Sequence, residues 1–364
     1  MKILFYFGHP AQYLFLRETM IRLKKKGVNI KILIKTKDVL EELLSKDGFE
    51  YTNILLQERG KSKILIALSL LKRELKILPI IIKYKPDILI STDAPFAQLG
   101  KLLGIHRITI TEDDYEVIKT LGKLTYPFTE IILCPEVCEV GKWGHKKVGY
   151  SGYMKLGYLH PNVFSKDKTI IKKYNFSDKY VIIRLAKLTA HHDFGIKGID
   201  STFVLRIIAT FEKQSYRVYI SAEGEIEEQF DKYLLQINSN EMHQVLASAS
   251  FLICDSQSMS VEAAMLGVPS IRFSSFAGRI SVLEELEHKY QLTFGIKPDK
   301  PELLFNKIKE LFELPNLKEE FQDRRKKMLK DKIDVTTFMV WLIKNYPESV
   351  KIMKKNPDYQ YRFK

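Results

Sequence analysis

One stretch of the sequence, FLICDSQSMSVEAAMLGVPSIRF at residues 251–273, restricts the fold more than any other. Phe251–Cys254 and Ser270–Phe273 are short apolar runs of the kind that form buried parallel strands. Between them, Met259–Leu266 has the composition of a helix, and Gly267 lies where a glycine commonly ends one. Parallel strands need such a crossover, so the stretch predicts an α/β fold built on a parallel sheet.

The polar residues between the first of these strands and the helix predict a ligand site. Ligands of open α/β sheets bind outside the carboxyl ends of the strands. The free N–H groups of a helix's first turn suit an anion such as a diphosphate. Glu262, one turn into the helix, could accept hydrogen bonds from ribose hydroxyls. The alternative is an ordinary βαβ unit in which Ser258 or Ser260 only caps the helix.

The alternation of strand and helix extends over most of the chain. Lys2–Phe7 and Asn29–Lys35 are apolar strands, each followed by a helical segment, and Tyr180–Arg184 begins a second series. A chain of 364 residues is long enough for two domains. Glycines and a proline in residues 148–161 permit a hinge. The sequence therefore predicts two doubly wound parallel sheets, with a domain boundary near Asn162.

Composition favours a soluble globular protein, because 45% of the residues are hydrophobic and 28% are charged. Three cysteines do not make a disulfide framework, which indicates a reducing, cytoplasmic location. No apolar run approaches the roughly 20 residues needed to span a bilayer. The first residues read as a strand and not as a signal peptide.

The net charge of +14 is unevenly distributed along the chain. Residues 1–160 hold 26 Lys/Arg against 17 Asp/Glu, residues 161–323 hold 20 against 23, and residues 324–364 hold 12 against 4. This pattern predicts a negatively charged partner, such as an anionic membrane surface or a phosphate-bearing acceptor. Solubility in a Lys-rich proteome is the alternative. Nucleic acid is not expected, because no motif that binds it is present.

Residues 61–85 combine seven Lys/Arg and one Glu with repeated Ile and Leu at helical spacing. Such a helix could lie on anionic lipid, which would place the protein on the inner face of the plasma membrane. It could also be an outer helix that packs on the sheet, and packing is favoured for most of its length because a strand follows directly. Pro79 is expected to kink or split the helix.

Several polar side chains are predicted to lie at the carboxyl ends of strands. His9 follows the first strand, and it is as well suited to be a general base as to be a turn histidine. Asp93 and Glu112 end later strands, where acids also cap helices. In the second half, a loop crowds cations and imidazoles that suit a diphosphate leaving group. These residues are Arg184, Lys187, His191, His192 and Lys197.

The segment DSQSMSVEAAMLGVPSI, residues 255–271, resembles the C-terminal-domain signature of GT-B nucleotide-sugar enzymes. These include the non-hydrolysing UDP-GlcNAc 2-epimerases and the peptidoglycan-precursor GlcNAc transferase. The epimerase pattern has glycines where this chain has Gln257 and Ser258. The similarity extends from Met1 to about Pro298 and is closest to the family catalogued as domain of unknown function 354.

The resemblance implies the GT-B fold, in which two Rossmann-like, doubly wound parallel-sheet domains face an interdomain cleft. Residues 1–161 would form the acceptor domain and residues 162–323 the nucleotide-sugar domain, with basic helices in residues 324–364 crossing back to the first. The resemblance also implies positions for the site. Ser256, Gln257 and Ser258 would lie near phosphate, Glu262 on ribose, His243 near uracil, Asp93 and Glu112 on acid/base positions, and His191 or His192 on a functional histidine.

We therefore expect a glycosyltransferase that uses a nucleotide-diphosphate sugar, UDP-linked, in the synthesis of a surface polysaccharide or glycoconjugate. The acceptor would be a glycan or a lipid-linked molecule, and neither a metal nor another cofactor is expected. A UDP-GlcNAc 2-epimerase is the alternative enzyme, and a non-catalytic nucleotide-sugar-binding protein is a third interpretation. In the preferred hypothesis, donor-binding residues are Arg184, Lys187, Ser256–Ser258 and Glu262, and the base is His9, Asp93 or Glu112.

Overall fold

The computed structural model describes residues 1–35, 39–55, 63–185, 199–224 and 226–364. The chain divides into two compact units. Unit 1 comprises Met1–Val163 together with Lys332–Lys364, and unit 2 comprises Phe164–Asp331. The predicted third segment, 324–364, therefore begins inside a helix of unit 2, and the chain returns to unit 1 at Lys332.

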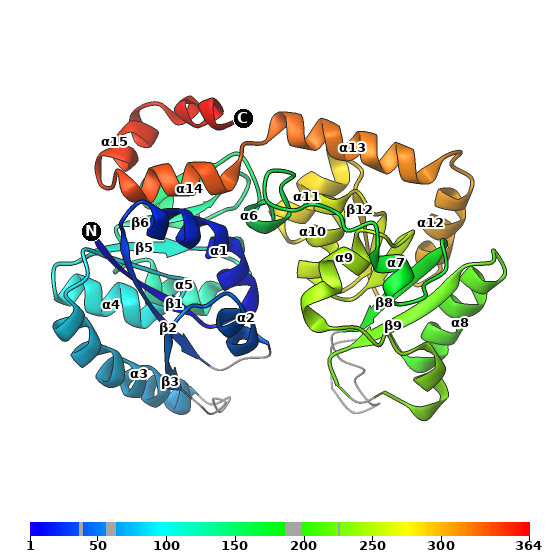
Figure 1. The fold of residues 1–364 in the computed structure, drawn as a ribbon, viewed down its shortest axis with the longest axis horizontal. Coiled ribbons are helices and arrows are strands. Elements are labelled where there is room, and N and C mark those ends of the chain that lie inside the picture. Colours follow the sequence, from blue (N-terminus) through cyan, green and yellow to red (C-terminus); the bar gives the residue numbers. More distant parts are fainter. Residues whose placement is uncertain (36–38, 56–62, 186–198, 225) are drawn as a thin grey trace. The chain divides into compact units, whose positions relative to one another are not determined.

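Unit 1 is built on a parallel sheet whose strands, in the described part of the chain, run in the order β3-β2-β1-β4-β5-β6-β7. Helices cover both faces of this sheet (Figure 1). The strands are β1 (Lys2–Phe7), β2 (Asn29–Lys35), β3 (Tyr51–Leu55), β4 (Ile88–Ser91), β5 (His106–Ile110), β6 (Ile131–Pro135) and β7 (Lys147–Tyr150). The helices are α1 (Pro10–Lys25), α2 (Leu40–Lys46), α3 (Lys63–Tyr84), α4 (Ala94–Leu102), α5 (Lys119–Thr125), η1 (Gly141–Lys146), α6 (Leu156–Leu159), α14 (Val335–Lys344), α15 (Glu348–Lys355) and η4 (Pro357–Phe363).

Unit 2 repeats this architecture on a smaller parallel sheet, ordered β12-β11-β10-β8-β9 within the residues described. Its strands are β8 (Tyr180–Leu185), β9 (Arg217–Ala222), β10 (Phe251–Cys254), β11 (Ser270–Phe273) and β12 (Thr293–Ile296). Its helices are α7 (Ile170–Lys173), α8 (Ser201–Glu212), η2 (Glu228–Tyr233), η3 (Ser239–Glu241), α9 (Met242–Leu246), α10 (Gln257–Leu266), α11 (Ser281–His288), α12 (Glu302–Phe312) and α13 (Leu317–Asp331).

The packing of the two units depends on strands that are buried on both faces and on the buried face of helix α3. All four residues of β10 and of β11 are buried, as expected for parallel strands covered on both faces. Helix α3 continues through Pro79, so the predicted split does not occur. Ile77 and Ile81, on either side of that proline, are fully buried in the core of unit 1 and hold the helix on the sheet.

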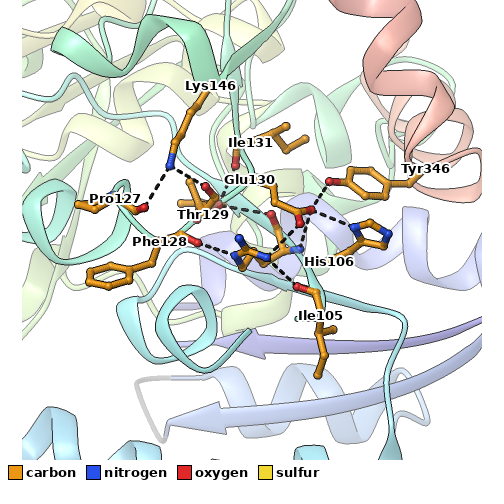
Figure 2. Close-up of polar contacts among 11 residues, drawn as sticks. Ile105, His106, Pro127, Phe128, Thr129, Glu130, Ile131, Lys146 and Tyr346 are labelled. Carbon is orange, nitrogen blue, oxygen red and sulfur yellow. Dashed lines mark hydrogen bonds and ion pairs between the residues drawn. The ribbon is translucent and has the colours of Figure 1, made fainter. Parts of the chain in front are cut away.

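A polar cluster around Glu130, shown in Figure 2, joins the C-terminal helices to the rest of unit 1. The Glu130 carboxylate accepts hydrogen bonds from Tyr346 Oη at 2.6 Å and from Arg107 Nη1 at 3.0 Å, and His106 Nδ1 lies at 3.0 Å. Nearby, Lys146 Nζ donates to the Thr129 carbonyl oxygen at 2.8 Å. Contacts between residues more than two hundred positions apart thus complete the first domain.

Candidate functional site

The N-terminus of α10 lies at the carboxyl end of β10, where the sequence predicts a ligand site. Ser256, and not Ser258 or Ser260, is the N-cap, and its Oγ accepts the Met259 N–H at 3.3 Å. The helix ends at Gly267, whose φ of +69° is in the left-handed region that favours glycine. A ten-residue helix therefore directs the N–H groups of its first turn to the edge of the sheet.

Gln257 links the first turn of α10 to the end of the neighbouring strand. Its Nε2 donates to Ser274 Oγ at 2.7 Å and to the Asp255 carbonyl at 3.2 Å. Its Oε1 is buried and meets no donor in the described ranges. Ser258 is partly buried in the same turn. The predicted phosphate-binding residues thus lie together, and Gln257 retains an unused acceptor.

Glu262 and His243 come together from two helices of unit 2. Glu262 Oε1, on α10, lies 3.4 Å from His243 Nε2, on α9, and both side chains are partly buried. The carboxylate is one turn beyond the helix start, where it can accept hydrogen bonds from vicinal hydroxyls. The pairing was not predicted, although both residues were singled out for a nucleotide site.

Of the cations and imidazoles predicted at the end of β8, the structure describes Arg184. Arg184 donates from Nη1 to Ser221 Oγ at 2.7 Å and from Nη2 to Glu223 Oε1 at 2.5 Å, so it joins the ends of β8 and β9. Lys187, His191, His192 and Lys197 lie outside the described residues, and their predicted roles stay predictions.

In unit 1, His9 caps α1 with its ring. Its backbone is extended, at φ −155° and ψ 142°, and Nδ1 accepts the Ala11 N–H at 3.1 Å. An imidazole that accepts at Nδ1 is, when neutral, protonated at Nε2. His9 could take a proton at Nδ1 only by giving up the cap, so this arrangement suits a hydrogen-bond donor at Nε2 better than a general base.

Asp93 has two structural contacts at the end of β4. Oδ1 accepts the Ala94 N–H at 2.9 Å and caps α4, and Oδ2 forms an ion pair with the buried Arg73 of α3. The pKa of the neighbouring Tyr6 is raised to about 12 by burial and by the charge of Asp93. Arg73 is only 5% exposed, so this cation of α3 lies inside the unit and not on its surface.

Glu112 forms a buried ion pair just after β5. Its Oε2 lies 2.8 Å from Lys155 Nζ, and its Oε1 accepts the Met154 N–H at 2.6 Å. The two charged side chains are only 11% and 7% exposed. The contacts fix the end of β5 to the segment that leads into α6.

Asp113 is the acidic residue that sequence reasoning passed over. Its neighbour Asp114 is buried and accepts the Glu139 N–H at 2.7 Å, whereas Asp113 is exposed and its carboxylate makes no hydrogen bond or ion pair to the described part of the chain. Removal of water by the surrounding protein raises the pKa of Asp113, and the charges of Glu112 and Asp114 raise it further, against the opposing effect of Lys155. Because Asp113 is exposed, solvent moderates this shift. The run of three consecutive acids at residues 112–114 was the sequence signal that could have identified it.

A small apolar pocket lies close to these acids in unit 1. It opens at the carboxyl ends of β1 and β4, beneath the first turns of α1. Its walls are Tyr6, Phe7, Gln12, Phe15, Leu16, Ile90, Ser91, Thr92, Ile110 and Met154. The polar rim includes a hydrogen bond of 2.7 Å from Gln12 Nε2 to Thr92 Oγ1. The carboxyl edge of the first sheet therefore offers both an apolar surface and an exposed carboxylate.

Two further observations concern metals and membranes. In the ranges that the structure describes, no three His, Cys, Asp or Glu side chains gather in a way that could hold a metal ion. Among the helices of those same ranges, none combines the length and apolar character needed to cross a bilayer.

Several solved structures have a similar fold. The chain is similar to the S. aureus MnaA–UDP co-structure, with 14% identity, a TM-score of 0.68 and 97% of each chain covered. The Neisseria meningitidis UDP-GlcNAc 2-epimerase bound to UDP-GlcNAc has 14% identity and a TM-score of 0.64, over 88% of this chain and 94% of that one. Acinetobacter baumannii MurG has 13% identity and a TM-score of 0.59, over 94% and 99%.

These similarities show the GT-B fold, with two Rossmann-like domains, and confirm the predicted fold class. No curated protein sequence matches the chain. A family model described as "Protein of unknown function (DUF354)" matches residues 6–346.

Proposed function

Because the chain belongs to the DUF354 family and has the GT-B fold, we propose that it is a glycosyltransferase with a nucleotide-diphosphate sugar, UDP-linked, as donor. Its product would be a surface polysaccharide or another glycoconjugate. The observation that carries the choice of reaction is the state of the acidic side chains in unit 1, where Asp93 and Glu112 are held in ion pairs and Asp113 is not.

Unit 2 supports the donor side of the proposal. The first turn of α10 offers bare N–H groups to a diphosphate, and the helix dipole adds to their attraction for negative charge. Glu262 would accept the ribose hydroxyls, with His243 beside it. A neutral tautomer of that histidine could also donate to the base. No metal is needed for this arrangement.

The acids of unit 1 favour transfer over epimerisation. A 2-epimerase must remove and return the C2 proton, which needs carboxylates that can change their protonation. Glu112 and Asp93 are each engaged in an ion pair with a buried cation, so neither carboxylate can reach a substrate carbon without breaking that pair. Transfer needs only one base, and the raised pKa of Asp113 fits that role.

The proposed step is a displacement at the anomeric carbon of the donor. Asp113 takes the proton from the acceptor hydroxyl, whose oxygen forms the new bond to the anomeric carbon. The bond from that carbon to the diphosphate oxygen breaks, and its electron pair leaves with the nucleoside diphosphate. The N–H groups at the start of α10 stabilise the charge that develops there.

A turnover assay with UDP-GlcNAc and related UDP sugars tests the proposal. Release of UDP that depends on an added glycan or lipid-linked acceptor supports transfer. Formation of the C2 epimer without acceptor would instead identify a 2-epimerase. Binding without turnover under any acceptor would identify a nucleotide-sugar-binding protein.

Calorimetry with UDP tests the donor site directly. Glu262→Ala should weaken UDP binding about tenfold or more, because a carboxylate bonded to ribose contributes roughly 1.5–3 kcal/mol. Glu228→Ala, which changes an exposed glutamate of the same unit, is the matched control and should bind normally. Equal affinities for the two variants would remove the proposed nucleotide site.

We also propose that the acceptor is presented at an anionic membrane surface, to which α3 binds. Three apolar residues of its outer face are exposed, Leu71 at 52%, Leu75 at 63% and Ile82 at 57%. Exposed Lys72 and Lys83 flank them. Apolar side chains between lysines are the pattern of a helix that lies in a lipid headgroup layer.

Vesicle flotation tests this surface. Wild-type protein should float with phosphatidylglycerol vesicles at low salt, and less at high salt, because each lysine near the surface contributes about 1 kcal/mol. A Leu71→Gln, Leu75→Gln variant should stay in solution. Leu303→Gln, at an exposed leucine of α12 in unit 2, should float like wild type. Wild-type protein that ignores anionic vesicles at low salt would exclude membrane binding by this surface.

A further inference from the structure

Arg272 is a fully buried arginine whose guanidinium has no hydrogen-bond partner in the described part of the chain. It lies on β11, its side chain is 0% exposed, and Nε, Nη1 and Nη2 all lack a hydrogen-bond acceptor among the residues described. Buried charged groups in proteins are normally paired, because an unpaired one loses its hydration without compensation. The position therefore needs an acceptor that the described part of the chain does not supply.

The neighbours of Arg272 place its side chain on the face of the sheet that α10 covers. Ser270, two residues earlier, bonds to Ser260 of α10 at 3.1 Å, whereas Phe273 stacks on Phe203 of α8 at 4.7 Å. Residues i and i+2 of a strand share a face. Ser274 continues that face, because its N–H donates to the Ile296 carbonyl and extends the ladder.

Arg272 therefore belongs to a row of buried polar side chains that extends along one face of β11 toward the start of α10. Inward of it lies a hydroxyl cluster, in which Ser260 contacts Thr293 at 2.6 Å. Outward of it lies Ser274, which accepts the hydrogen bond from Gln257 in the first turn of α10. The Gln257 Oε1, like the guanidinium, has no partner in the parts of the chain that are described.

Glu287 is the acidic side chain that could pair with Arg272, but its carboxylate is hydrogen-bonded to the backbone instead. A Cβ on Gly295 would lie 2.7 Å from Arg272 Nη2 and 3.2 Å from Glu287 Oε2, so the two groups flank the same bare backbone position. Yet Glu287 Oε2 accepts the Gly295 N–H at 2.9 Å, and the carboxylate forms no ion pair with Arg272. Burial, the largest effect on each group, lowers the pKa of Arg272 and raises the pKa of Glu287, and it outweighs the attraction between the two charges.

We infer that Arg272 binds the second phosphate of the nucleoside diphosphate whose first phosphate is held by the N-terminus of α10. The inference rests on the proposed function and adds a residue to it. The guanidinium, whose Nη2 lies 2.7 Å from the position of a Cβ on Gly295, would have to turn from β12 toward the Gln257–Ser274 pair to meet this phosphate. A guanidinium offers paired donors that match two phosphate oxygens, which an amide-lined helix start alone does not provide.

The test compares UDP, UMP and inorganic pyrophosphate by calorimetry on the full-length chain. Wild-type protein should prefer UDP to UMP by at least about tenfold, the effect expected of a charge-assisted bidentate contact. Arg272→Met should lose that preference and bind pyrophosphate at least about tenfold more weakly, with UMP affinity retained. Arg272→Lys should fall between, because lysine keeps the charge and loses the fork. Arg217→Met, at an exposed arginine of the same unit, should match wild type.

Thermal unfolding without ligand separates ligand binding from a role in the fold. Removal of an unpaired buried charge should leave the unfolding temperature of Arg272→Met unchanged or higher. A lower unfolding temperature that Arg272→Met/Glu287→Gln restores would show an internal ion pair and overturn the inference. Wild-type protein that binds neither UDP nor pyrophosphate would overturn both this inference and the proposed function. Unchanged UDP preference in Arg272→Met would overturn the inference alone.

Discussion

Three consecutive acids, residues 112–114, differ in what they contact, and the difference predicts their roles. Asp113→Asn should lower kcat by about 10²–10³-fold and change the donor KM little, because a general base acts on the reacting hydroxyl and not on the donor. The base works when deprotonated, so wild-type kcat/KM should rise with pH through the raised pKa of Asp113 and be flat above it. A pH–rate profile in which Asp113→Asn keeps that acidic limb would exclude the assignment.

Glu112, one residue earlier, should affect stability more than chemistry. Glu112→Gln leaves the Lys155 ammonium buried without its counter-charge, and we expect a loss of about 3–5 kcal/mol in the free energy of unfolding. Urea denaturation measures this loss. The double variant Glu112→Gln/Lys155→Met should recover much of it, and a single variant as stable as wild type would show that the pair contributes nothing.

For single residues, the sequence predicts where in the fold a side chain lies but not which side chains it contacts. Strand ends could be read from apolar runs, which placed Asp93, Glu112 and His9 correctly at one edge of the sheet. Their contacts come from Arg73 and Lys155, which lie 20 and 43 positions away, and no local pattern specifies such pairings. The roles of Lys187, His191 and His192 stay predictions, because these residues lie outside those that the structure describes.

The elements themselves were more predictable, because burial on both faces leaves a strong apolar signal. The bounds of β1, β2, β10 and β11 match the predicted strands. Helix α10 begins two residues before the predicted start, because Ser256 and not Ser258 supplies the cap. Any of several serines could have capped it, and the choice depends on backbone geometry that sequence does not fix.

Both ends of α10 should therefore be sensitive to substitution. Ser256→Ala should cost about 1 kcal/mol through the lost cap, with Ser258→Ala as the neighbouring control. Gly267→Ala should cost more, because φ is +69° and a Cβ would lie 2.5 Å from Gln322 Nε2. Chemical denaturation of the three variants ranks their free energies of unfolding. A Gly267→Ala protein as stable as wild type would show that the end of the helix adjusts to the added Cβ without cost.

On the scale of the whole molecule, the Glu130 cluster should make the attachment of the C-terminal helices dependent on pH. Burial alone would raise the pKa of Glu130, but hydrogen bonds from Tyr346 and His106 and the charge of Arg107 lower it overall. A carboxylate whose pKa is lower in the folded state stabilises that state above its usual value of 4.5, and the stabilisation is lost as the pH falls through the folded-state pKa.

Thermal unfolding between pH 7 and pH 3 tests this dependence. Wild-type stability should fall with acidification below about pH 5, and Glu130→Gln should be less stable at neutral pH but show a smaller fall. Tyr346→Phe, which removes one donor to the carboxylate, should lie between the two. Parallel pH curves for wild type and Glu130→Gln would show that other carboxylates govern the acid response.

The discontinuous make-up of unit 1 has a consequence for how the protein is made. Lys332–Lys364 leaves the ribosome only after all of unit 2 has emerged, so the uninterrupted middle of the chain can finish folding while the earlier-synthesised domain still waits for its last helices. During that interval α1 lacks the cover of α14, and its apolar side is open to chaperones. A chain truncated at residue 331 should thus hold a protease-resistant second domain together with a first domain that is still digestible.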